Sequence, residues 1–307
     1  MKRFPTLVRV LIFCCILSTP LYAYVTRKVL SSSKTIMQIK WPSGPINWQM
    51  TTTPGSNISG SREVGDVMRQ SFRTWSSIPT ALISFTEGPP VTVKAGNDGK
   101  NVVVTNLKDN DWTALGLDQS ILALTVSFFS DTGQLLDADI VFNPSLSFST
   151  NDTVPPDKID FQSVLTHEIG HLLGLDHTPS VSSTMFWVIR DGMANQRTPT
   201  ADDIAGVSSI YPSASFFSKG TLQGTVRTTA NVPVYGAVVV AVNSNGQSVA
   251  SVITDMDGRY SIAGLDAGQY TVYAQTLDVF TNSDDFPTLS RINPGQKVTT
   301  GFTARFR

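Results

Sequence analysis

All three histidines of this 307-residue chain fall within one eleven-residue segment, HEIGHLLGLDH, at residues 167–177. Positions four apart share one face of a helix, so His167 and His171 can direct two imidazoles at a single ion. Gly174 can take a positive φ, which predicts that the chain leaves the helix sharply at this point. The turn can bring His177 back as a third ligand. This spacing predicts a metal-binding helix and turn.

The surrounding residues favour a helix over residues 161–173. Asp160 is a candidate N-cap, and a stripe of apolar residues follows it at helical spacing. Thr153-Val-Pro-Pro156 forms a break before the helix. The alternative is an ordinary core helix whose histidines are satisfied by hydrogen bonds, but the full motif disfavours it.

Three nitrogen ligands with one open position are typical of a catalytic zinc site, whereas structural zinc sites are usually closed by four protein ligands. Glu168 is adjacent to His167 and too close in sequence to coordinate the same ion easily. It can reach a zinc-activated water instead and act as general base. No glutamate follows Glu168, which excludes a downstream glutamate as third ligand; a downstream aspartate stays possible, although His177 is already suitably spaced.

Beyond this motif, residues of about 41–212 resemble the metzincin peptidases and, among them, the matrixins. Met185 follows His177 by eight residues, as the methionine of the matrixin Met-turn does. Three further segments are similar to matrixin elements: Ile121-Leu-Ala-Leu-Thr125 to the edge strand, Asp137-Ala-Asp-Ile-Val-Phe-Asn143 to the next strand, and Asp202-Asp-Ile-Ala-Gly-Val207 with Tyr211-Pro212 to the closing helix.

The resemblance implies an α+β catalytic domain, with a twisted five-stranded sheet, three helices and a cleft. It implies that Met185 forms a hydrophobic floor beneath one catalytic zinc ion. It also implies that the strand at Leu122 and Ala123 pairs with an extended substrate, and that residues 186–197 wall a substrate pocket. Taken alone, Met185 could be an ordinary core methionine, and residues 121–125 a buried strand.

The sequence departs from the matrixin pattern at several points. Thr178 follows the third histidine where matrixins usually have serine, and Trp187 stands where an astacin-type tyrosine ligand would be. The absence of further histidines excludes the usual second, structural zinc. Asp131 and residues 137–139 could bind calcium or could be solvated turn acids.

Other segments carry weaker signals. The pattern predicts a helix over residues 62–78, with Ser61 as N-cap, and another over residues 201–210 after Thr200. Strands are expected at residues 46–50, 81–85, 91–93, 102–104, 121–129 and 138–142.

Residues 219–307 change character, with short strand-like runs between Gly, Asn and Asp turns. They predict an all-β sandwich after a linker at residues 213–218, with strands at about 234–242, 247–254, 260–262 and 269–274. Residues 220–274 resemble the carboxypeptidase regulatory-like, transthyretin-like domain, on segments such as Gly224-Thr-Val226, Val234-Tyr-Gly-Ala-Val-Val239, Thr254-Asp-Met-Asp-Gly-Arg-Tyr260 and Leu265-Asp-Ala-Gly-Gln-Tyr270. Asp255 begins a β-turn rather than a calcium loop, because a later carboxylate is missing. We expect a passive appendage that docks, spaces, or binds a protein or surface ligand.

The first residues have the pattern of an export signal, with Lys2 and Arg3, an apolar run, and a cleavage point after Ala23. We expect a signal peptide at 1–23, a polar lead-in at 24–40, and a secreted or extracellular protein, periplasmic in a Gram-negative cell. A retained membrane anchor is the alternative. Cys14 and Cys15 both lie in this run, so the mature chain would have no disulfide and no cysteine switch.

The net charge of −1, from 23 basic and 24 acidic residues, argues against nucleic acid or a membrane surface as a partner. The sequence therefore predicts a secreted zinc-dependent endopeptidase that acts on proteins or peptides. A zinc-binding pseudoenzyme or adhesion protein and a terminal-trimming exopeptidase are the alternatives.

Overall fold

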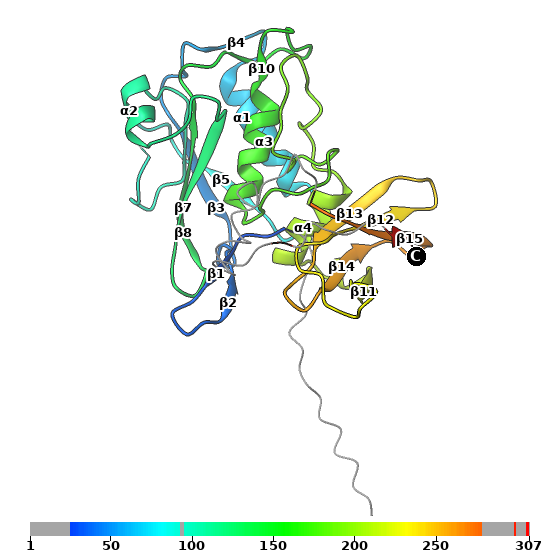
Figure 1. The fold of residues 1–307 in the computed structure, drawn as a ribbon. Helices are drawn as coiled ribbons and strands as arrows, with labels where there is room; N and C mark the ends of the chain where they lie inside the picture. The colour runs from blue at the N-terminus through cyan, green and yellow to red at the C-terminus, as the bar shows by residue number, and fades with distance from the viewer. Residues whose placement is uncertain (1–24, 93–94, 278–297, 299–304, 307) are drawn as a thin grey trace, which may run out of the picture.

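The computed structural model describes residues 25–92, 95–277, 298 and 305–306 (Figure 1). The predicted signal peptide therefore lies outside the described residues. No helix in the described part is both long and apolar enough to cross a membrane.

The first part of the chain is built on a five-stranded mixed sheet in the order β5-β3-β6-β8-β7. Only β7 runs antiparallel to its neighbour, and it forms one edge of the sheet. The strands are β3 (Ile46–Met50), β5 (Phe85–Glu87), β6 (Val102–Val104), β7 (Ala123–Phe129) and β8 (Leu135–Phe142). The predicted fold class of a mixed α+β domain followed by an all-β region is confirmed.

Two helices pack together on this sheet (Figure 1): α1 (Val64–Ser76) and α3 (Phe161–Leu172). The Trp75 indole N–H donates to the Thr166 carbonyl at 2.9 Å, which ties the two helices across a fully buried contact. Helix α3 begins as predicted, because the Asp160 carboxylate accepts from the Ser163 N–H at 2.8 Å. Helix α4 (Ala201–Ile210) also begins after Thr200 as predicted, in a capping box with Asp203.

Several boundaries differ from the sequence prediction. Helix α1 starts after Glu63 rather than Ser61, which lies in a bend before the helix and donates its N–H to the Asn151 side chain at 2.7 Å. The predicted strand at 81–85 is wrong, because the Leu82 N–H donates to the Tyr211 carbonyl outside the sheet. The sheet strand in this region, β5, begins only at Phe85. Val91 makes an isolated bridge, and residue 93 lies outside the described part.

The structure adds elements that the sequence pattern did not predict. The lead-in contains a hairpin of β1 (Lys28–Leu30) and β2 (Ile36–Gln38), and a short helix α2 (Asp109–Ala114) buries Trp112. A small parallel sheet joins β4 (Ile58–Ser59), β9 (Phe148–Ser149) and β10 (Ile159–Asp160).

The described residues of the C-terminal part form two sheets. One pairs β11 (Gly220–Thr225) with β14 (Arg259–Leu265); the other has the order β13-β12-β15-β16. Its strands are β12 (Val238–Asn243), β13 (Ser248–Ile253), β15 (Tyr270–Gln275) and β16 (Arg305–Phe306). The expected β-turn at Asp255 is confirmed, because the Gly258 N–H donates to the Asp255 carbonyl and Gly258 has a φ of 72°.

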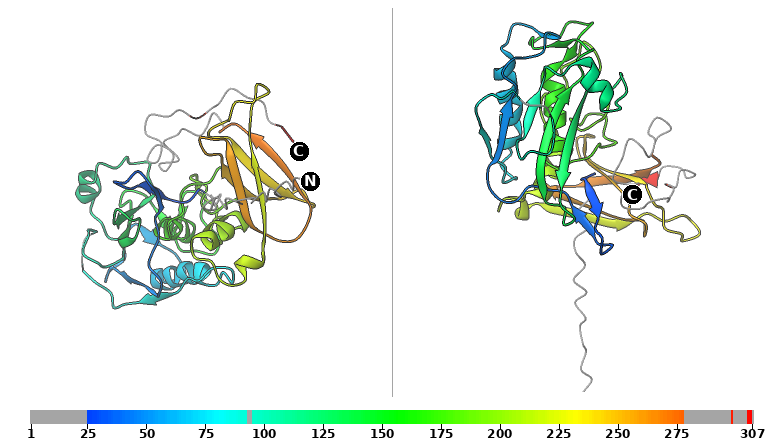
Figure 2. Two further views of the ribbon diagram at one scale, coloured as in Figure 1. Left: turned by 90° about the horizontal axis from the view of Figure 1, so that it is seen from below. Right: turned by 90° about the vertical axis from the view of Figure 1, so that its left-hand side faces the viewer.

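Helix α4 and the sandwich share a hydrophobic core. Ala205 of α4 packs with Val239, Val252, Ile262 and Leu265 of the sandwich. A Cβ at Gly264 would meet Ala205 at 3.2 Å, so strand β14 approaches the helix closely. The two views in Figure 2 show the sandwich strands, in yellow to orange, beside one end of the first part. The short 3-10 helix η1 (Phe216–Ser218) connects them and buries Phe216.

Candidate metal centre

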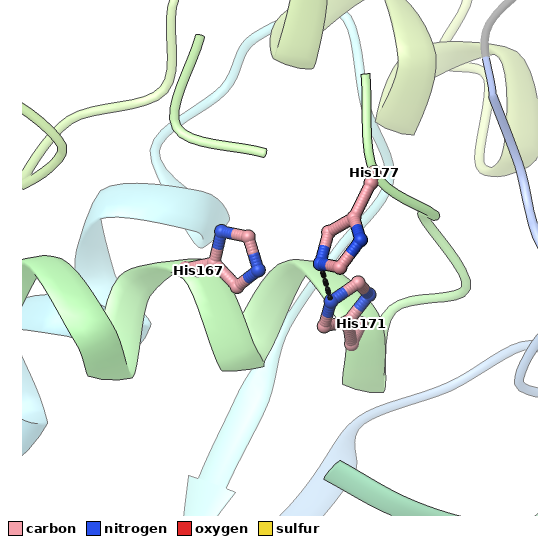
Figure 3. Close-up of side chains that lie close together, drawn as sticks. All are labelled: His167, His171 and His177. Atoms are coloured by element: carbon pink, nitrogen blue, oxygen red, sulfur yellow. Dashed lines mark hydrogen bonds between the residues drawn. The ribbon is translucent and has the colours of Figure 1, made fainter. Parts of the chain in front are cut away.

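The three histidines converge at the C-terminal end of α3. Figure 3 shows His167 and His171 projecting from the helix and His177 facing them from the chain that follows it. One possible ligand atom from each residue lies within 4.8 Å of the other two, and the Nε2 atoms of His171 and His177 are 3.2 Å apart. Ligands held at about 2.0–2.1 Å by a tetrahedral zinc ion have separations of this order.

Backbone carbonyls orient two of these rings. His167 Nδ1 lies 2.8 Å from the Thr184 carbonyl oxygen, and His171 Nδ1 lies 2.9 Å from the Leu175 carbonyl oxygen. Each carbonyl requires a proton on Nδ1, which leaves the Nε2 lone pair available for a metal. Burial lowers the pKa of His167 to about 3 and that of His171 well below its usual range, with nearby histidine charge adding to both effects. The donor set therefore fits zinc.

Gly174 allows the chain to turn back toward the helix. Its φ is 94°, and a Cβ there would overlap the Ile39 carbonyl oxygen. An L side chain would thus be both strained and crowded at this position. The predicted sharp turn after the helix is confirmed.

Glu168 is on the same helix as the first two histidines, and only 6% of its surface is exposed. Its carboxylate accepts from the Thr125 hydroxyl on β7 at 2.6 Å. Burial raises the Glu168 pKa to about 7, while the Thr125 hydrogen bond and the Arg27 charge oppose that rise. A carboxylate with a pKa near 7 is well suited to take up and release a proton at neutral pH.

Met185 lies against the metal-binding helix. It is 2% exposed, and a Cβ at Gly170 would overlap its sulfur atom. The turn that carries it is fastened by Asp203, which accepts from the Ser183 hydroxyl, from the Thr184 N–H at 2.9 Å and from the Met185 N–H at 3.0 Å. A side chain at position 170 would therefore force Met185 to move.

The strand with Leu122 and Ala123 lies at the sheet edge. The Leu122 carbonyl accepts from the Asn143 N–H at 3.0 Å, and Ala123 begins β7 opposite Phe142. Backbone groups alternate in direction along an antiparallel ladder, so those of Ala123 and Thr125 point away from β8. Of the two predicted substrate-binding residues, Leu122 thus already has a carbonyl partner within the sheet.

Two supporting residues were given no site role from the sequence. Thr125 was part of the edge-strand motif but was not connected with Glu168, and Asp203 was assigned only to the first turn of α4. A hydroxyl at alternating strand positions and an acid in a helix N-terminus are common features, so neither carried a specific signal.

The acidic residues considered for calcium differ in their surroundings. Asp137 and Asp139 are buried and accept backbone hydrogen bonds from residues 96–102, so the interpretation as solvated turn acids is wrong for them. Asp131 instead bonds Ser32 at the surface.

Comparison with known proteins agrees with this geometry. Metalloendoproteinase 1-MMP of Arabidopsis thaliana is 28% identical over 173 residues, which are 56% of this chain and 44% of the relative. Metalloendoproteinase 5-MMP of the same plant is 26% identical over 175 residues, 56% and 45% of the two chains. Matrilysin of Rattus norvegicus is 40% identical over 53 residues, 17% and 20%. The chain thus spans less than half the length of these relatives.

Two family models match successive parts of the chain. A carboxypeptidase regulatory-like domain matches residues 221–300. The matrixin peptidase model matches residues 40–212, more than half of the chain, and the histidine helix, the turn at Gly174 and the methionine turn all lie within that match. On this evidence the chain belongs to the matrixin family.

Proposed function

We propose that this protein is a secreted zinc-dependent endopeptidase that cuts internal bonds of extended protein substrates. His167, His171 and His177 hold the zinc ion, and Glu168 is the general base. The observation that carries the proposal is the convergence of three imidazoles (Figure 3) at the helix that also carries the buried Glu168 carboxylate. The metalloendoproteinase names of the relatives support the same reaction class.

When bound, zinc supplies Lewis-acid activation of a water molecule and of the scissile carbonyl. Glu168 accepts a proton from that water as its oxygen attacks the carbonyl carbon. The carboxyl then delivers this proton to the leaving nitrogen as the C–N bond breaks, so the base is regenerated. Thr125 orients the carboxylate, because its single hydroxyl proton is shared between the Glu168 carboxylate at 2.6 Å and the Glu168 backbone carbonyl at 2.9 Å.

The edge of the sheet at β7 is the proposed substrate-binding strand. An extended peptide can add to it by backbone hydrogen bonds, which require no particular side chain. The outward direction of the Ala123 backbone supports this role, whereas the Leu122 backbone faces β8 and Leu122 contributes through its side chain. Residues 186–197 form the proposed wall of the adjacent pocket, and Met185 its floor beneath zinc. Calcium has no assigned role.

The remaining proposals concern organisation and location. We propose a signal peptide at 1–23, a lead-in at 24–40, a protease domain at 41–212, a linker at 213–218 and a sandwich domain at 219–307. Export fits a matrixin domain, and the −1 net charge fits a lack of nucleic-acid partners. A zinc-binding pseudoenzyme is disfavoured because Glu168 is present and is held by Thr125 beside the histidines.

The decisive experiment compares casein and peptide cleavage by the wild type and Glu168→Gln at matched zinc content, with and without a chelator. Glutamine has nearly the same shape but cannot accept the proton, so the rate should fall at least about 10²-fold. Glu63→Gln, at an exposed glutamate before α1, is the matched control and should keep full activity.

A zinc-loaded wild type that cuts neither casein nor a peptide library would overturn the proposal in favour of a binding function. Product maps distinguish the exopeptidase alternative, since internal cuts support an endopeptidase and ladders from one end contradict it.

A further inference from the structure

We propose that the C-terminal sandwich and residues 25–27 position His177 and thereby contribute to the zinc affinity of the metal centre. Both lie outside the residues that match the matrixin family model. The inference rests on the proposed role of His177 as third zinc ligand. It replaces the expectation that the sandwich is a passive appendage.

His177 differs from the other two histidines in its support. His167 and His171 are fixed by helix α3, whereas His177 stands on irregular chain beyond the turn at Gly174. A ligand on such a segment keeps its place only through contacts that the segment makes with the rest of the protein. Groups that orient metal ligands typically contribute 10–100-fold, in order of magnitude, to metal affinity.

One contact connects the residue after His177 to the sandwich. The Thr178 hydroxyl donates to Asp202 at 2.8 Å and lies 3.0 Å from the Ser251 hydroxyl of β13. Ser251 also donates its backbone N–H to Asp202 at 2.5 Å. All three residues are buried, with 3%, 6% and 1% of their surfaces exposed. Asp202 therefore joins the loop that carries His177 and Thr178 to the sandwich, in a buried contact.

A second contact reaches the residues before His177 from the N-terminal side. The Arg27 N–H donates to the Gly174 carbonyl at 2.7 Å, and the Asp176 N–H donates to the Val25 carbonyl at 2.7 Å. Thr26 and Leu175 form the antiparallel bridge between these bonds. Residues 25–27 thus run antiparallel to the loop between the second and third histidines.

A third contact faces the His177 ring itself. The ring centroids of His177 and Trp187 are 6.4 Å apart. Trp187 in turn packs on a cluster that includes Val25 together with Tyr235, Val238 and Val240 of the sandwich. Val25 of the N-terminal segment 25–27 and the sandwich residues therefore pack against the same tryptophan.

Helix α4 connects these contacts, because it carries Asp202 and packs Ala205 into the sandwich core. In Figure 1, α4 lies between the end of α3 and the strands β13 and β14. Movement of the sandwich would consequently be transmitted to Thr178, and from there to His177.

The test uses the full-length chain and buried hydroxyl substitutions. Thr178→Val removes the hydroxyl at nearly constant shape, Thr178→Ser restores it, and Ser251→Ala removes the sandwich hydroxyl. Thr254→Val is the matched control, because its hydroxyl donates to the Val234 carbonyl inside the sandwich and makes none of the bonds to Asp202 or Thr178. The readouts are zinc affinity against a competing chelator, the absorption spectrum of the cobalt-substituted protein, and kcat and KM separately.

Thr178→Val should weaken zinc binding about 10-fold and alter the cobalt spectrum, while Thr178→Ser stays near wild type. Ser251→Ala should show a smaller loss, since its N–H still donates to Asp202, and the double variant should be non-additive. The kcat should fall with KM nearly unchanged. Thr254→Val should lower the melting temperature alone.

Zinc affinities within twofold of wild type for Thr178→Val and Ser251→Ala, or an equal loss in Thr254→Val, would overturn this inference alone. A wild type that binds zinc but cleaves nothing overturns the proposed peptidase function and leaves these affinity comparisons valid. A wild type that binds no zinc overturns both.

Discussion

Among the described residues, the part up to Pro212 buries eight carboxylate or imidazole side chains, whereas the part from Lys219 onward buries none. The buried polar side chains of that second part are Ser251, Thr254 and Ser261. Their hydroxyls are satisfied by one or two hydrogen bonds each and, being neutral, need no counter-charge. The described part of the sandwich is thus stabilised by apolar burial, while the first part directs hydrogen-bond donors at the carboxylates that it encloses and leaves only Asp137 Oδ1, among the described carboxylate oxygens, buried without a partner.

This difference shows how the first part of the chain accommodates buried carboxylates. Asp160, Asp202 and Asp203 each accept hydrogen bonds from several backbone or hydroxyl donors, which reduce the cost of burying a charge, although burial and the Asp203 charge still raise the pKa of Asp202 to about 7. Ser251 is the sandwich residue that joins one of these networks, through Asp202. The sandwich therefore contributes no charge to the site but contributes a donor.

The largest expected effect is on function. His171→Ala removes one proposed zinc ligand from the first part of the chain. Peptide cleavage should fall to the detection limit, because zinc with two protein ligands is held weakly. The melting temperature of the zinc-free protein should change little, since two hydrogen bonds are lost, to the Leu175 carbonyl and to His177 Nε2. Ser261→Ala, at a buried sandwich hydroxyl, is the control and should retain activity. Equal activity of His171→Ala and wild type would contradict the ligand assignment.

The next effect compares one ion pair from each part. Arg197 forms two hydrogen bonds with Asp160, at 2.6 and 2.8 Å, and the carboxylate is fully buried. Arg197→Ala leaves that charge without its cation and should lower the free energy of unfolding by about 3–5 kcal/mol. Lys219→Ala breaks the pair with Asp266, whose side chain is 81% exposed, and should cost less than about 1 kcal/mol. Denaturant unfolding measures both, and similar losses would refute the contrast.

A core substitution tests whether the two parts unfold separately. Ile262 is fully buried in the cluster that contains Ala205 of α4. Ile262→Ala should cost about 2–5 kcal/mol and shift one calorimetric transition for the whole chain, because α4 belongs to both parts. Two transitions, with only one of them shifted by the substitution, would show that the shared helix does not couple the cores.

The sequence predicted helix α3 and the turn after it well because their signals are local. The cap at Asp160, the four-residue spacing of the first two histidines and the turn at Gly174 each depend on neighbours within a few residues. Helix α4 was predicted for the same reason, since Thr200 and the acids of its first turn form a local start signal.

Features set by distant partners could not be predicted. Residues 25–27 are ordered by the loop at 174–176, some 150 positions away in sequence, and nothing in their polar pattern indicates that pairing. The local pattern predicts Ser61 as a helix cap, but the structure places it before the helix, with its N–H donated to Asn151, 90 positions away. The contact between Thr178 and Ser251 crosses two family domains, so neither domain's pattern contains it.

The smallest expected effect concerns pH. Asp139 is buried on β8, and burial raises its pKa to about 6, opposed by hydrogen bonds from Gly96 and Val102 and assisted by the charges of Asp137 and Asp98. Below its unfolded pKa near 3.8 the carboxyl is protonated in both states and contributes no pH dependence. As the pH rises toward 6, the unfolded chain ionises before the folded one, so the folded protein loses relative stability and the full penalty is present above pH 6.

Asp139→Asn removes this titration. The free energy of unfolding of the wild type minus that of the variant should therefore fall by about 1–2 kcal/mol between pH 4 and pH 6.5 and stay constant above that range. Denaturant titrations of the zinc-free proteins across this range measure it, with Asp266→Asn, an exposed carboxylate of the sandwich, as control. A difference that rises with pH would mean that the hydrogen bonds from Gly96 and Val102 outweigh burial. In that case the buried carboxylates of the first part would be net stabilising at neutral pH, and the contrast with the uncharged sandwich interior would be one of composition rather than of energetic cost.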